Sequence, residues 1–306
     1  MAIVWQLSII NLEKKALVSG VVLRELPPMH SGRITSLKNL FKLSRSYFIK
    51  RFSNEKISIL NDKQTIETTT DENGSFYVEV DFNISGQLSI ASGSDPPMEI
   101  VQDYPIIFEN STADFDVISD VDDTIMVSHT AALFKRVGTL AFTVPQRRKA
   151  IPFTKKLLEE FTKLNARVFY VSKSESNLFN MIVSIIKYHQ LPQGVLILTP
   201  YLKFRQLFNY DKGHDYKENH IRFLFENSDK KKFVLLGDDS QRDLEVYADI
   251  ATAYPDRVLR IYIRQTQSYR KKTLQEIWER IESSGVSARY FKTGDSIDGE
   301  LKYVTS

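Results

Sequence analysis

Cysteine is missing from the 306 residues of this sequence, and several kinds of site are excluded with it. A chain without cysteine has neither a disulfide framework nor thiolate chemistry. Zinc sites built on cysteine are excluded too, and the five histidines show no paired spacing that would replace it. We therefore expect no disulfide-stabilised fold and no zinc site.

Long hydrophobic runs are also absent. No window approaches the roughly 18 uninterrupted apolar residues of a transmembrane helix. The opening stretch, MAIVWQLSII, is apolar but short, and it lacks the charged region and the small-residue cleavage site of a signal peptide. We therefore expect a cytoplasmic protein.

An excess of charge of one sign is missing as well. The 41 lysines and arginines nearly balance the 38 acidic residues, and the net charge of +3 predicts no nucleic-acid partner. No phosphate-cradling Gly-x-x-x-x-Gly-Lys loop occurs, which argues against a nucleotide kinase. What is present is 42% hydrophobic residues, a content typical of soluble proteins with a sizeable core. The length is comfortable for two domains.

The first ~110 residues have the pattern of β-strands. Short alternating or β-branched runs are separated by turn signals such as DENG, and no helical period is convincing. This pattern favours an all-β, sandwich-like domain over residues 1–110. Residues 91–115, rich in Ser, Asp and Pro, are predicted to be a linker region. The predicted strands are ALVSGVVLREL, KISIL, QTIETTT and SFYVEVDF.

A basic segment interrupts this half at residues 32–56, where a hairpin loop is expected. It carries seven lysines and arginines against one acid, interleaved with leucine and aromatic residues. One interpretation is a solvated helical insertion, and the other is an amphipathic segment that contacts anionic lipid. In the second case the apolar face would come from Leu37, Leu40, Phe41, Phe48 and Phe52.

From residue 115 onward strands and helices alternate. The strands are nearly continuous apolar runs, which indicates that both faces of the sheet are covered. We therefore predict an α/β fold with a doubly wound parallel sheet over residues 111–306. The predicted strands are FDVIS, ARVFYVS, GVLILT, KFVLLG and RVLRIYI, and the predicted helices are FTKKLLEEFTKL, ESNLFNMIVSIIKYH, YKENHIRFLFEN and RDLEVYADIA.

Polar side chains follow several of these strands at the point where each strand ends, and ligands of such sheets bind beyond the carboxyl ends. Taken singly, each motif is also explained by a cap, a turn or a solvated lysine. Taken together, carboxylates gathered on one rim are costly without a cation, and oxygen ligands suit Mg²⁺. The residues are Asp120, Asp122 and Asp123 after the first strand, Ser172 after the second, Asp238, Asp239 and Asp243 after KFVLLG, and Lys217 at the start of the helix that leads to that strand.

These motifs, in this order and spacing, resemble the four motifs of the haloacid dehalogenase-like phosphatases over roughly residues 115–265. The phrases SDVDDTI, YVSKSESNLF and FVLLGDDSQRDLEVYADI further resemble the fungal actin-patch phosphatidate phosphatase family and its bacterial relatives. The first half also looks like the accessory domain that often precedes that catalytic domain. The resemblance implies a Mg²⁺-dependent phosphatase acting on phosphatidate or a related lipid phosphate.

The resemblance assigns roles to four catalytic residues. Asp120 would be the nucleophile that forms an aspartyl-phosphate, and Asp122 would be the general acid and base. Ser172 would hydrogen-bond a phosphoryl oxygen, and Lys217 would neutralise Asp120 and the phosphate charge.

The same resemblance assigns a Mg²⁺ ion to the acidic residues. The Asp120 side chain, the Asp122 backbone carbonyl and Asp238 would hold the ion. Asp243, and with it Asp239, would support the ion from nearby.

The gaps between the motifs leave no room for a large cap domain. Between Thr124 and Ser172 lie 47 residues, which include a full predicted helix, and between Ser172 and Lys217 lie 44, most of which a predicted helix and strand fill. Residues 125–149 could form only a small flap. An open pocket admits a lipid headgroup or a protein side chain. Together with the basic segment, the run Arg147, Arg148 and Lys149 would suit an anionic membrane surface.

Other readings stay open at this point. A phosphatase of the same chemistry could act on a phosphoprotein or a nucleic acid end, and a non-catalytic membrane-binding adaptor is a third alternative. Both Asp120 and Asp122 argue against the adaptor, which has no need of them. The histidines His129, His214 and His220 suit surface or capping roles, while His214 with Lys212 could recognise a second anionic group, and His129 could line the pocket.

Overall fold

The computed structural model describes residues 2–27, 44–61, 64–127, 148–200, 216–240, 242–266 and 272–305. The chain forms two compact units, one made of Met1–Asn110, Ser174–Ser184 and Leu198–His214, the other of Ser111–Lys173, Ile185–Ile197 and Asp215–Ser306. Several predictions lie outside the described residues, namely those for Leu37, Leu40, Phe41, His129, Arg147, Lys212 and His214.

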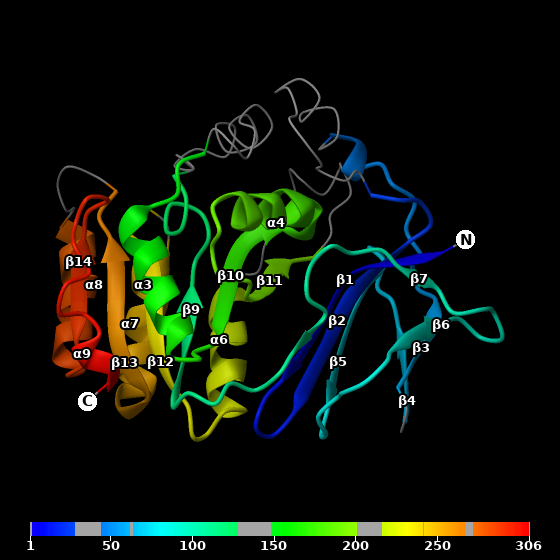
Figure 1. Cartoon of the computed structure of the whole chain (residues 1–306), viewed down its shortest axis with the longest axis horizontal. Coiled ribbons are helices and arrows are strands. Elements are labelled where there is room, and N and C mark those ends of the chain that lie inside the picture. The colour runs from blue at the N-terminus through cyan, green and yellow to red at the C-terminus, as the bar shows by residue number, and fades with distance from the viewer. Residues whose placement is uncertain are drawn as a thin grey trace. The chain divides into compact units, whose positions relative to one another are not determined.

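A six-stranded sheet in the order β11-β10-β9-β12-β13-β14 forms the centre of the α/β part (Figure 1). The pairings β9–β10, β9–β12, β12–β13 and β13–β14 are all parallel. The predicted parallel sheet and α/β class are therefore confirmed. The strands are β9 (Phe115–Ser119), β10 (Val168–Glu175), β11 (Val195–Thr199), β12 (Lys232–Asp238), β13 (Val258–Arg264) and β14 (Ala288–Phe291).

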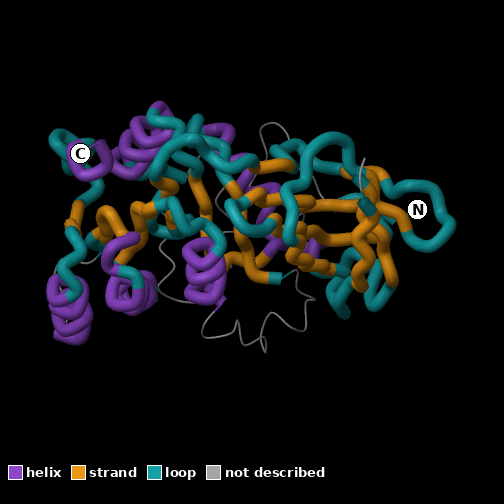
Figure 2. Tube along the Cα trace, turned by 90° about the horizontal axis from the view of Figure 1, so that it is seen from below, coloured by secondary structure: helices purple, strands orange, loops and turns teal. Residues whose placement is uncertain are grey.

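Helices cover both faces of this sheet, as Figure 2 shows. Helix α6 (Tyr216–Glu226) contacts α7 (Asp243–Ala253), which contacts α8 (Lys272–Ser283), so these three share one face. Helix α3 (Pro152–Lys163) lies on the other. The remaining helices are η2 (Ser176–Leu178), α4 (Phe179–Tyr188), η3 (Pro255–Arg257) and α9 (Lys302–Thr305). Covered faces explain why the strands are continuously apolar.

The strand order places a switch point between β9 and β12. From β9 the chain moves outward through β10 to β11, and from β12 it moves the opposite way through β13 to β14. Adjacent strands whose connections diverge leave a crevice at their carboxyl ends. The backbone N–H of Asp120 donates to the carbonyl of Leu236 at 2.8 Å, which ties the two strand ends together at this point.

Helix α3 illustrates how local sequence sets an element. Pro152 occupies its first turn, where a missing N–H costs nothing. The predicted apolar face is buried, with Phe153 stacked on Phe291 at 4.1 Å between ring centroids. The sequence predicts that Leu164 belongs to this face, together with Phe153, Leu157, Leu158 and Phe161. The prediction is wrong for Leu164, because this residue is the C-cap and is 38% exposed.

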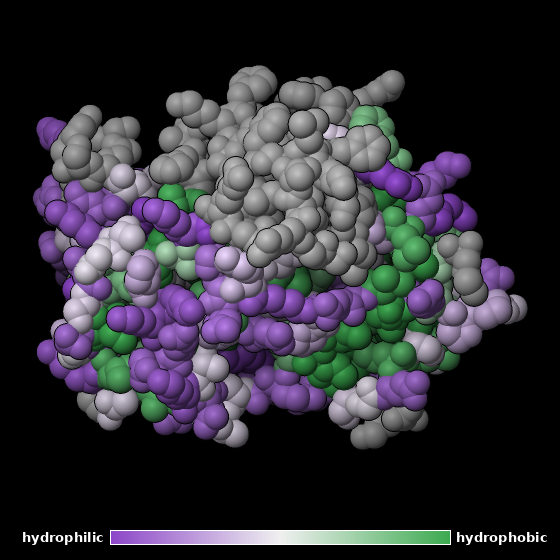
Figure 3. All heavy atoms as spheres, turned by 45° about the horizontal axis from the view of Figure 1, so that its top comes forward, coloured by the Kyte–Doolittle hydropathy of each residue, from purple (hydrophilic) through white to green (hydrophobic). Residues whose placement is uncertain are grey.

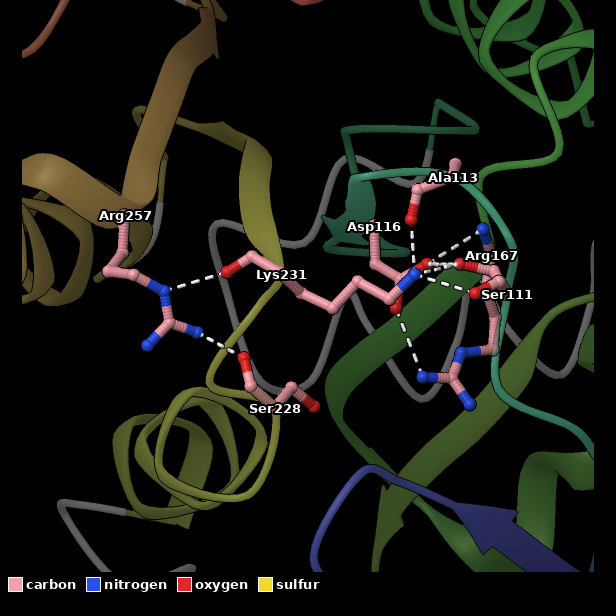
Figure 4. A network of polar contacts seen from close by, with 7 residues as sticks. All are labelled: Ser111, Ala113, Asp116, Arg167, Ser228, Lys231 and Arg257. Atoms are coloured by element: carbon pink, nitrogen blue, oxygen red, sulfur yellow. Dashed lines mark hydrogen bonds and ion pairs between the residues drawn. The ribbon is translucent and has the colours of Figure 1, made fainter.

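A buried polar network closes the amino end of the sheet, opposite the switch point (Figure 4). Asp116 on β9 is fully buried and accepts hydrogen bonds from the Arg167 guanidinium at 3.0 Å and the Ser111 hydroxyl at 2.7 Å. The Lys231 ammonium donates to the carbonyls of Ser111 and Ala113. Each charge therefore has partners, and the segment before β9 is fixed to the start of β12.

Replacing Asp116 with alanine should lower the free energy of unfolding by about 3–5 kcal/mol, because the buried Arg167 guanidinium loses its counter-ion. Urea denaturation measures this. The exposed ion pair between Arg280 and Asp249 provides the control, since Asp249→Ala should cost less than about 1 kcal/mol. Equal losses for the two variants would contradict the assignment of Asp116 as a structural residue.

The strands of residues 1–110 form two sheets. The first has the order β5-β2-β1-β7, with β8 also paired to β1, and the second has the order β4-β3-β6. Residues of both sheets, among them Val18, Ile57 and Phe76, share one hydrophobic core. The strands are β1 (Ile3–Asn11), β2 (Ala16–Leu23), β3 (Lys56–Leu60), β4 (Thr65–Thr69), β5 (Ser75–Val80), β6 (Ser89–Ala91), β7 (Glu99–Ile100) and β8 (Ile107–Phe108).

The sequence did not predict all of these strands. β1 lies between β2 and β7, although the sequence pattern does not predict it as a strand. β7 and β8 fall inside the predicted linker 91–115 and pair with β1 in parallel. Their two-residue length gives no periodic signal, which explains the difference. The division into an all-β domain over 1–110 and a catalytic domain over 111–306 stays a prediction.

Two further observations concern the predicted membrane interactions. None of the described helices combines the length and the apolar character needed to cross a bilayer. In the described part of the basic segment, Phe48 is 66% exposed, but Phe52 is buried in the core shared by the two sheets. The prediction that Phe52 belongs to an exposed apolar face is therefore wrong.

Candidate active site at the carboxyl end of the parallel sheet

Three buried aspartates meet at the switch point. Asp120 directly follows β9, Asp238 is the last residue of β12, and Asp243 is the first residue of α7. Each offers a carboxylate oxygen, and these oxygens lie within 4.8 Å of one another. All three residues are at most 3% exposed. The fold thus places Asp120 beside Asp238 and Asp243, which are more than 100 residues away in sequence, as expected for residues at the carboxyl ends of parallel strands.

Lys217, from the first turn of α6, binds two of these carboxylates. Its ammonium donates to Asp120 Oδ1 at 2.8 Å and to Asp243 Oδ1 at 2.6 Å, and its side chain is 1% exposed. Burial acts to lower the pKa of Lys217, but the carboxylates of Asp120 and Asp243 outweigh it and hold that pKa well above its ordinary value. The lysine is therefore a fixed positive charge beside Asp120.

Gly237 lets α7 approach β12 closely enough to place Asp243. A Cβ at this position would lie 2.7 Å from the Tyr247 ring and 2.8 Å from Asp243 Cβ. Tyr247 cannot easily give way, because it is fully buried and its hydroxyl donates to the Leu236 carbonyl at 2.8 Å. The glycine is therefore needed for contact rather than for backbone freedom.

Gly237→Ala should displace Asp243 and cost about 1–3 kcal/mol of stability from overpacking. Thermal unfolding measures the effect. Gly294→Ala is the matched control, because a Cβ there meets nothing within 4 Å. A Gly237→Ala protein with unchanged stability would contradict this account.

The oxygens of the cluster differ in how well they are satisfied. Asp243 accepts from Lys217 with Oδ1 and from the Asp238 backbone N–H with Oδ2, the latter at 3.4 Å. Asp238 Oδ1 accepts from the Ser240 backbone N–H. In contrast, Asp120 Oδ2 and Asp238 Oδ2 are buried without any hydrogen-bond donor among the described residues. Two unsatisfied carboxylate oxygens thus remain on Asp120 and Asp238.

This environment disfavours negative charge on both residues. Burial and the Asp243 carboxylate raise the pKa of Asp120 to about 7 against the opposing effect of Lys217. Burial, Asp243 and Asp120 hold the pKa of Asp238 well above its ordinary value. A set of buried, oxygen-only ligands that repel one another fits a hard divalent cation. The three aspartates therefore fit a metal site, in which the unbonded Oδ2 atoms of Asp120 and Asp238 would be the ligands.

The turn after Asp120 carries the other two acids of the motif. Asp122 and Asp123 are 2% and 5% exposed, and Asp122 offers no carboxylate to the three-acid cluster. Its predicted metal contact through the backbone carbonyl stays a prediction. Asp123 has a left-handed backbone with φ of +58°, which is uncommon for a residue with a side chain. The Arg264 guanidinium donates to the Asp123 carbonyl at 2.7 Å.

A second buried arginine, Arg148, faces this turn. Burial lowers the pKa of its guanidinium, while the nearby Asp122 and Asp123 carboxylates act to raise it. Its carbonyl is bound to the His189 ring at 2.7 Å. Because Arg148 is 2% exposed, the prediction that it lies on an anionic-membrane surface is wrong. A basic run in the sequence does not show which of its members turns inward.

The other predicted site residues, Ser172, Asp239 and His220, lie outside the three-aspartate cluster. Ser172 is 1% exposed and lies on β10, which extends to Glu175 and so contains the serine that was expected just after the strand. Asp239 Oδ1 accepts from the Thr266 backbone N–H at 2.8 Å, and Asp239 is not one of the three clustered acids. The His220 ring is bound to the Tyr216 carbonyl of its own helix at 2.8 Å, in agreement with a structural role.

Sequence reasoning missed Arg148, Arg264 and Tyr247. The signal for Arg264 was present, because it ends a strand of the same sheet as the acids do. Tyr247 lies one helical turn after Asp243, and its ring centroid is 5.8 Å from the Lys217 ammonium. Arg148 has no comparable signal, since it lies in no strand or helix.

Comparison with known proteins shows what the site-bearing part of the chain is similar to. Residues 115–265 match the family described as phosphatidate phosphatase APP1, catalytic domain, over the span that carries all the motifs. The phosphatidate phosphatase APP1 of Saccharomyces cerevisiae is 28% identical over 225 residues, which cover 68% of this chain and 36% of that protein. An uncharacterized protein of Schizosaccharomyces pombe is 25% identical over 241 residues, which cover 76% and 39%.

The chain spans less than two fifths of the length of these curated relatives. Among solved structures, a chain of the Pnkp1/Rnl/Hen1 complex matches over 67% of this chain and 57% of that chain, with 13% identity and a TM-score of 0.34, a likeness too low to support an argument. The sequence match and the motifs that it spans define the relationship. Residues 115–265 are thus similar to the catalytic domain of the APP1-like phosphatase family.

Proposed function

We propose that this chain is a Mg²⁺-dependent phosphatase that hydrolyses a phosphate monoester, with phosphatidate or a related lipid phosphate as its substrate. The family relationship supports a phosphoric monoester hydrolase. The observation that carries the proposal is the unsatisfied Oδ2 of Asp120 beside an equally unsatisfied Asp238 oxygen and the Lys217 ammonium. We further propose a haloacid dehalogenase-type fold without a large cap for residues 111–306, preceded by a sandwich-like domain over 1–110.

The first chemical step would transfer the phosphoryl group to Asp120. A carboxylate oxygen of Asp120 attacks phosphorus, and the bond between phosphorus and the ester oxygen breaks. The ester oxygen leaves with a proton from Asp122, so the alcohol departs neutral. An aspartyl-phosphate on Asp120 and an Asp122 carboxylate remain.

The second step would return both residues to their starting state. The Asp122 carboxylate takes a proton from water, and the water oxygen attacks phosphorus. The bond to Asp120 breaks, which releases inorganic phosphate and restores the Asp120 carboxylate and the protonated Asp122. The same side chain therefore acts as acid and then as base.

The neighbouring residues would hold the charges during both steps. Lys217 binds Asp120 before the reaction and would balance charge on the phosphoryl oxygens, with Ser172 donating a hydrogen bond to one of them. Asp120, Asp238 and the backbone carbonyl of Asp122 would hold Mg²⁺. Both oxygens of Asp243 are already bonded, so it would orient Lys217 and Asp238. When bound, Mg²⁺ would neutralise the charge that gathers on the transferred group.

Phosphate release from a panel of substrates tests this function. The panel contains short-chain phosphatidate, a phosphopeptide, nucleotides and a 5′-phosphorylated oligonucleotide, each with Mg²⁺ and with a chelator. We expect turnover of phosphatidate that requires the metal. Preference for the phosphopeptide or the oligonucleotide would replace the lipid substrate, and absence of turnover on every substrate would favour an adaptor without catalysis.

We also propose that the exposed part of the basic segment contacts anionic membranes. Phe48 and Leu26 are 66% and 61% exposed, and Arg45 and Lys50 are exposed beside Phe48 in sequence. The Arg24 backbone N–H donates to the Lys50 carbonyl, which joins the two stretches. Figure 3 shows hydrophobic residues gathered on the visible face of this strand-rich unit. Apolar and cationic groups together suit a lipid surface.

Lys50→Glu should weaken binding to vesicles of phosphatidylcholine and phosphatidylserine by about fivefold or more, because each cation near an anionic surface contributes about 1 kcal/mol. Phe48→Ser should weaken binding to the same vesicles, and co-sedimentation measures both. Leu164→Ser, at an exposed leucine of the α/β unit, is the control and should bind as the unchanged protein does. If both variants bind the vesicles as strongly as the unchanged protein does, this surface does not contact the membrane.

A further inference from the structure

We propose that Arg264 is a positioning residue that aims the general acid Asp122 by fixing the turn at Asp123. The inference rests on the function proposed above and adds a residue to which no role has been assigned. Arg264 is the last residue of β13, and its partner in the turn lies 141 positions earlier in the sequence. The contact therefore exists only because the fold creates it.

The contact itself is specific and buried. Arg264 Nη1 donates to the backbone carbonyl of Asp123 at 2.7 Å and to the carboxylate Oδ1 of the same residue at 3.4 Å. Arg264 is 9% exposed and Asp123 is 5% exposed. A charge-assisted hydrogen bond in such surroundings is stronger than one in water. One guanidinium group thus binds both the main chain and the side chain of Asp123.

The turn needs such an anchor. Asp123 has φ of +58°, and a left-handed conformation in a residue with a side chain costs of order 1–3 kcal/mol unless the surroundings impose it. Asp122 precedes this residue directly, so the peptide plane between them fixes the direction of the Asp122 backbone. Without the bond from Arg264, the turn could relax to a right-handed conformation and carry the Asp122 carboxyl group away from the leaving oxygen.

The backbone of Arg264 is fixed next to the proposed metal ligand Asp238. It pairs in register with Asp238, and its carbonyl accepts from the Asp239 backbone N–H at 3.2 Å. Its Nε donates to the Thr293 hydroxyl at 3.4 Å. In the sheet β12 separates β13 from β9, so the side chain spans the end of β12 to reach the Asp123 turn. Arg264 therefore connects the two acid-bearing segments of the site and sets their separation.

A double-mutant cycle with Asp122 tests this role. If Arg264 acts through Asp122, its loss should matter only while Asp122 can donate a proton. Arg264→Gln should lower kcat/KM for dioctanoyl phosphatidate by about 10- to 100-fold in the unchanged protein. In an Asp122→Asn background the same substitution should cost less than about threefold. Equal losses in the two backgrounds would overturn the proposal.

A leaving-group comparison gives a second readout that a purely structural role would not move. p-Nitrophenolate leaves without a proton, so Arg264→Gln should affect kcat/KM for p-nitrophenyl phosphate several-fold less than for phosphatidate. Arg264→Lys, which keeps a positively charged donor on a shorter side chain, should recover part of the loss on phosphatidate. If Arg264→Gln does not fold, Arg264→Lys carries the same cycle with a smaller expected loss.

Arg260 provides the matched control. It lies two residues earlier on β13, its side chain is equally buried, and it forms an ion pair with Glu300 at 3.3 Å. Arg260→Gln should lower stability but leave kcat/KM per folded molecule unchanged in both backgrounds. A loss on phosphatidate as large as that of Arg264→Gln would overturn the proposal. An unchanged protein that is inactive on both substrates with Mg²⁺ would instead remove the proposed phosphatase function, and this inference with it.

Discussion

Asp120→Asn is expected to abolish turnover, with a loss of about 10⁴-fold or more in kcat, because no other carboxylate can replace the attacking oxygen. The substitution preserves the shape of the side chain. It also removes one of the charges that repel one another in the Asp120, Asp238 and Asp243 cluster, and Lys217 keeps its bond to Asp243. The variant should therefore fold, and its inactivity should reflect chemistry. Phosphate release and urea denaturation on the same preparation measure both properties.

The control for this experiment lies on the same strand. Asp116→Asn changes a buried aspartate four residues earlier, at the opposite end of β9, where it binds Arg167 and Ser111. This variant should lose stability but keep normal turnover per folded molecule. Residual turnover of Asp120→Asn above about 1% of the unchanged protein would mean that another residue attacks phosphorus, and the assignment of Asp120 would be wrong.

Much of the α/β fold could be predicted from the sequence because its strands are buried on both faces. FDVIS coincides with β9, and the predicted helices begin and end within a few residues of α3, α4, α6 and α7. The first half was harder. β1 is buried along almost its whole length and so lacks a polar face, and β7 and β8 are too short for periodicity to show. Pairing partners distant in sequence decide such strands.

For the site, the sequence indicated which acids come together but not how each of their oxygens is bonded. The strand-end rule found Asp120, Asp238 and Asp243, because parallel strands place their carboxyl ends on one rim. It could not show that Asp243 has both oxygens bonded while Asp120 and Asp238 each keep one free. Arg148 illustrates the limit further, because a run of basic residues indicates a charged surface until the fold turns one of them inward.

The free energy of unfolding of the metal-free protein is expected to fall as pH rises from 5 to 8. The pKa of Asp120 is about 7 in the folded protein and that of Asp238 is well above the ordinary value of 3.8, so the native state binds more protons than the unfolded state in this range. Stability then decreases with pH, by about 1.4 kcal/mol for each unit of pKa difference that is titrated. The total loss should be on the order of 2–4 kcal/mol. Lys217 stays charged throughout, because its pKa lies above this window.

Mg²⁺ should reverse this loss. The cation competes with protons for the same oxygens, so it binds more tightly at pH 8 than at pH 5. At a concentration one hundred times its dissociation constant, it should add about 2.7 kcal/mol to the free energy of unfolding. The gain in stability on adding Mg²⁺ should therefore be clearly larger at pH 8. Urea denaturation at both pH values, with Mg²⁺ and with a chelator, measures it.

Asp238→Asn separates this effect from the titration of other groups. The half-buried histidines His189 and His220 have lowered pKa values, so the native state binds fewer protons there and stability changes with pH in the opposite sense. Their contribution is the same in the variant and cancels in the comparison. The variant should be more stable than the unchanged protein at pH 8 without metal, and it should gain little from Mg²⁺. A gain from Mg²⁺ that persists in Asp238→Asn, or that does not depend on pH, would show that the cation binds elsewhere.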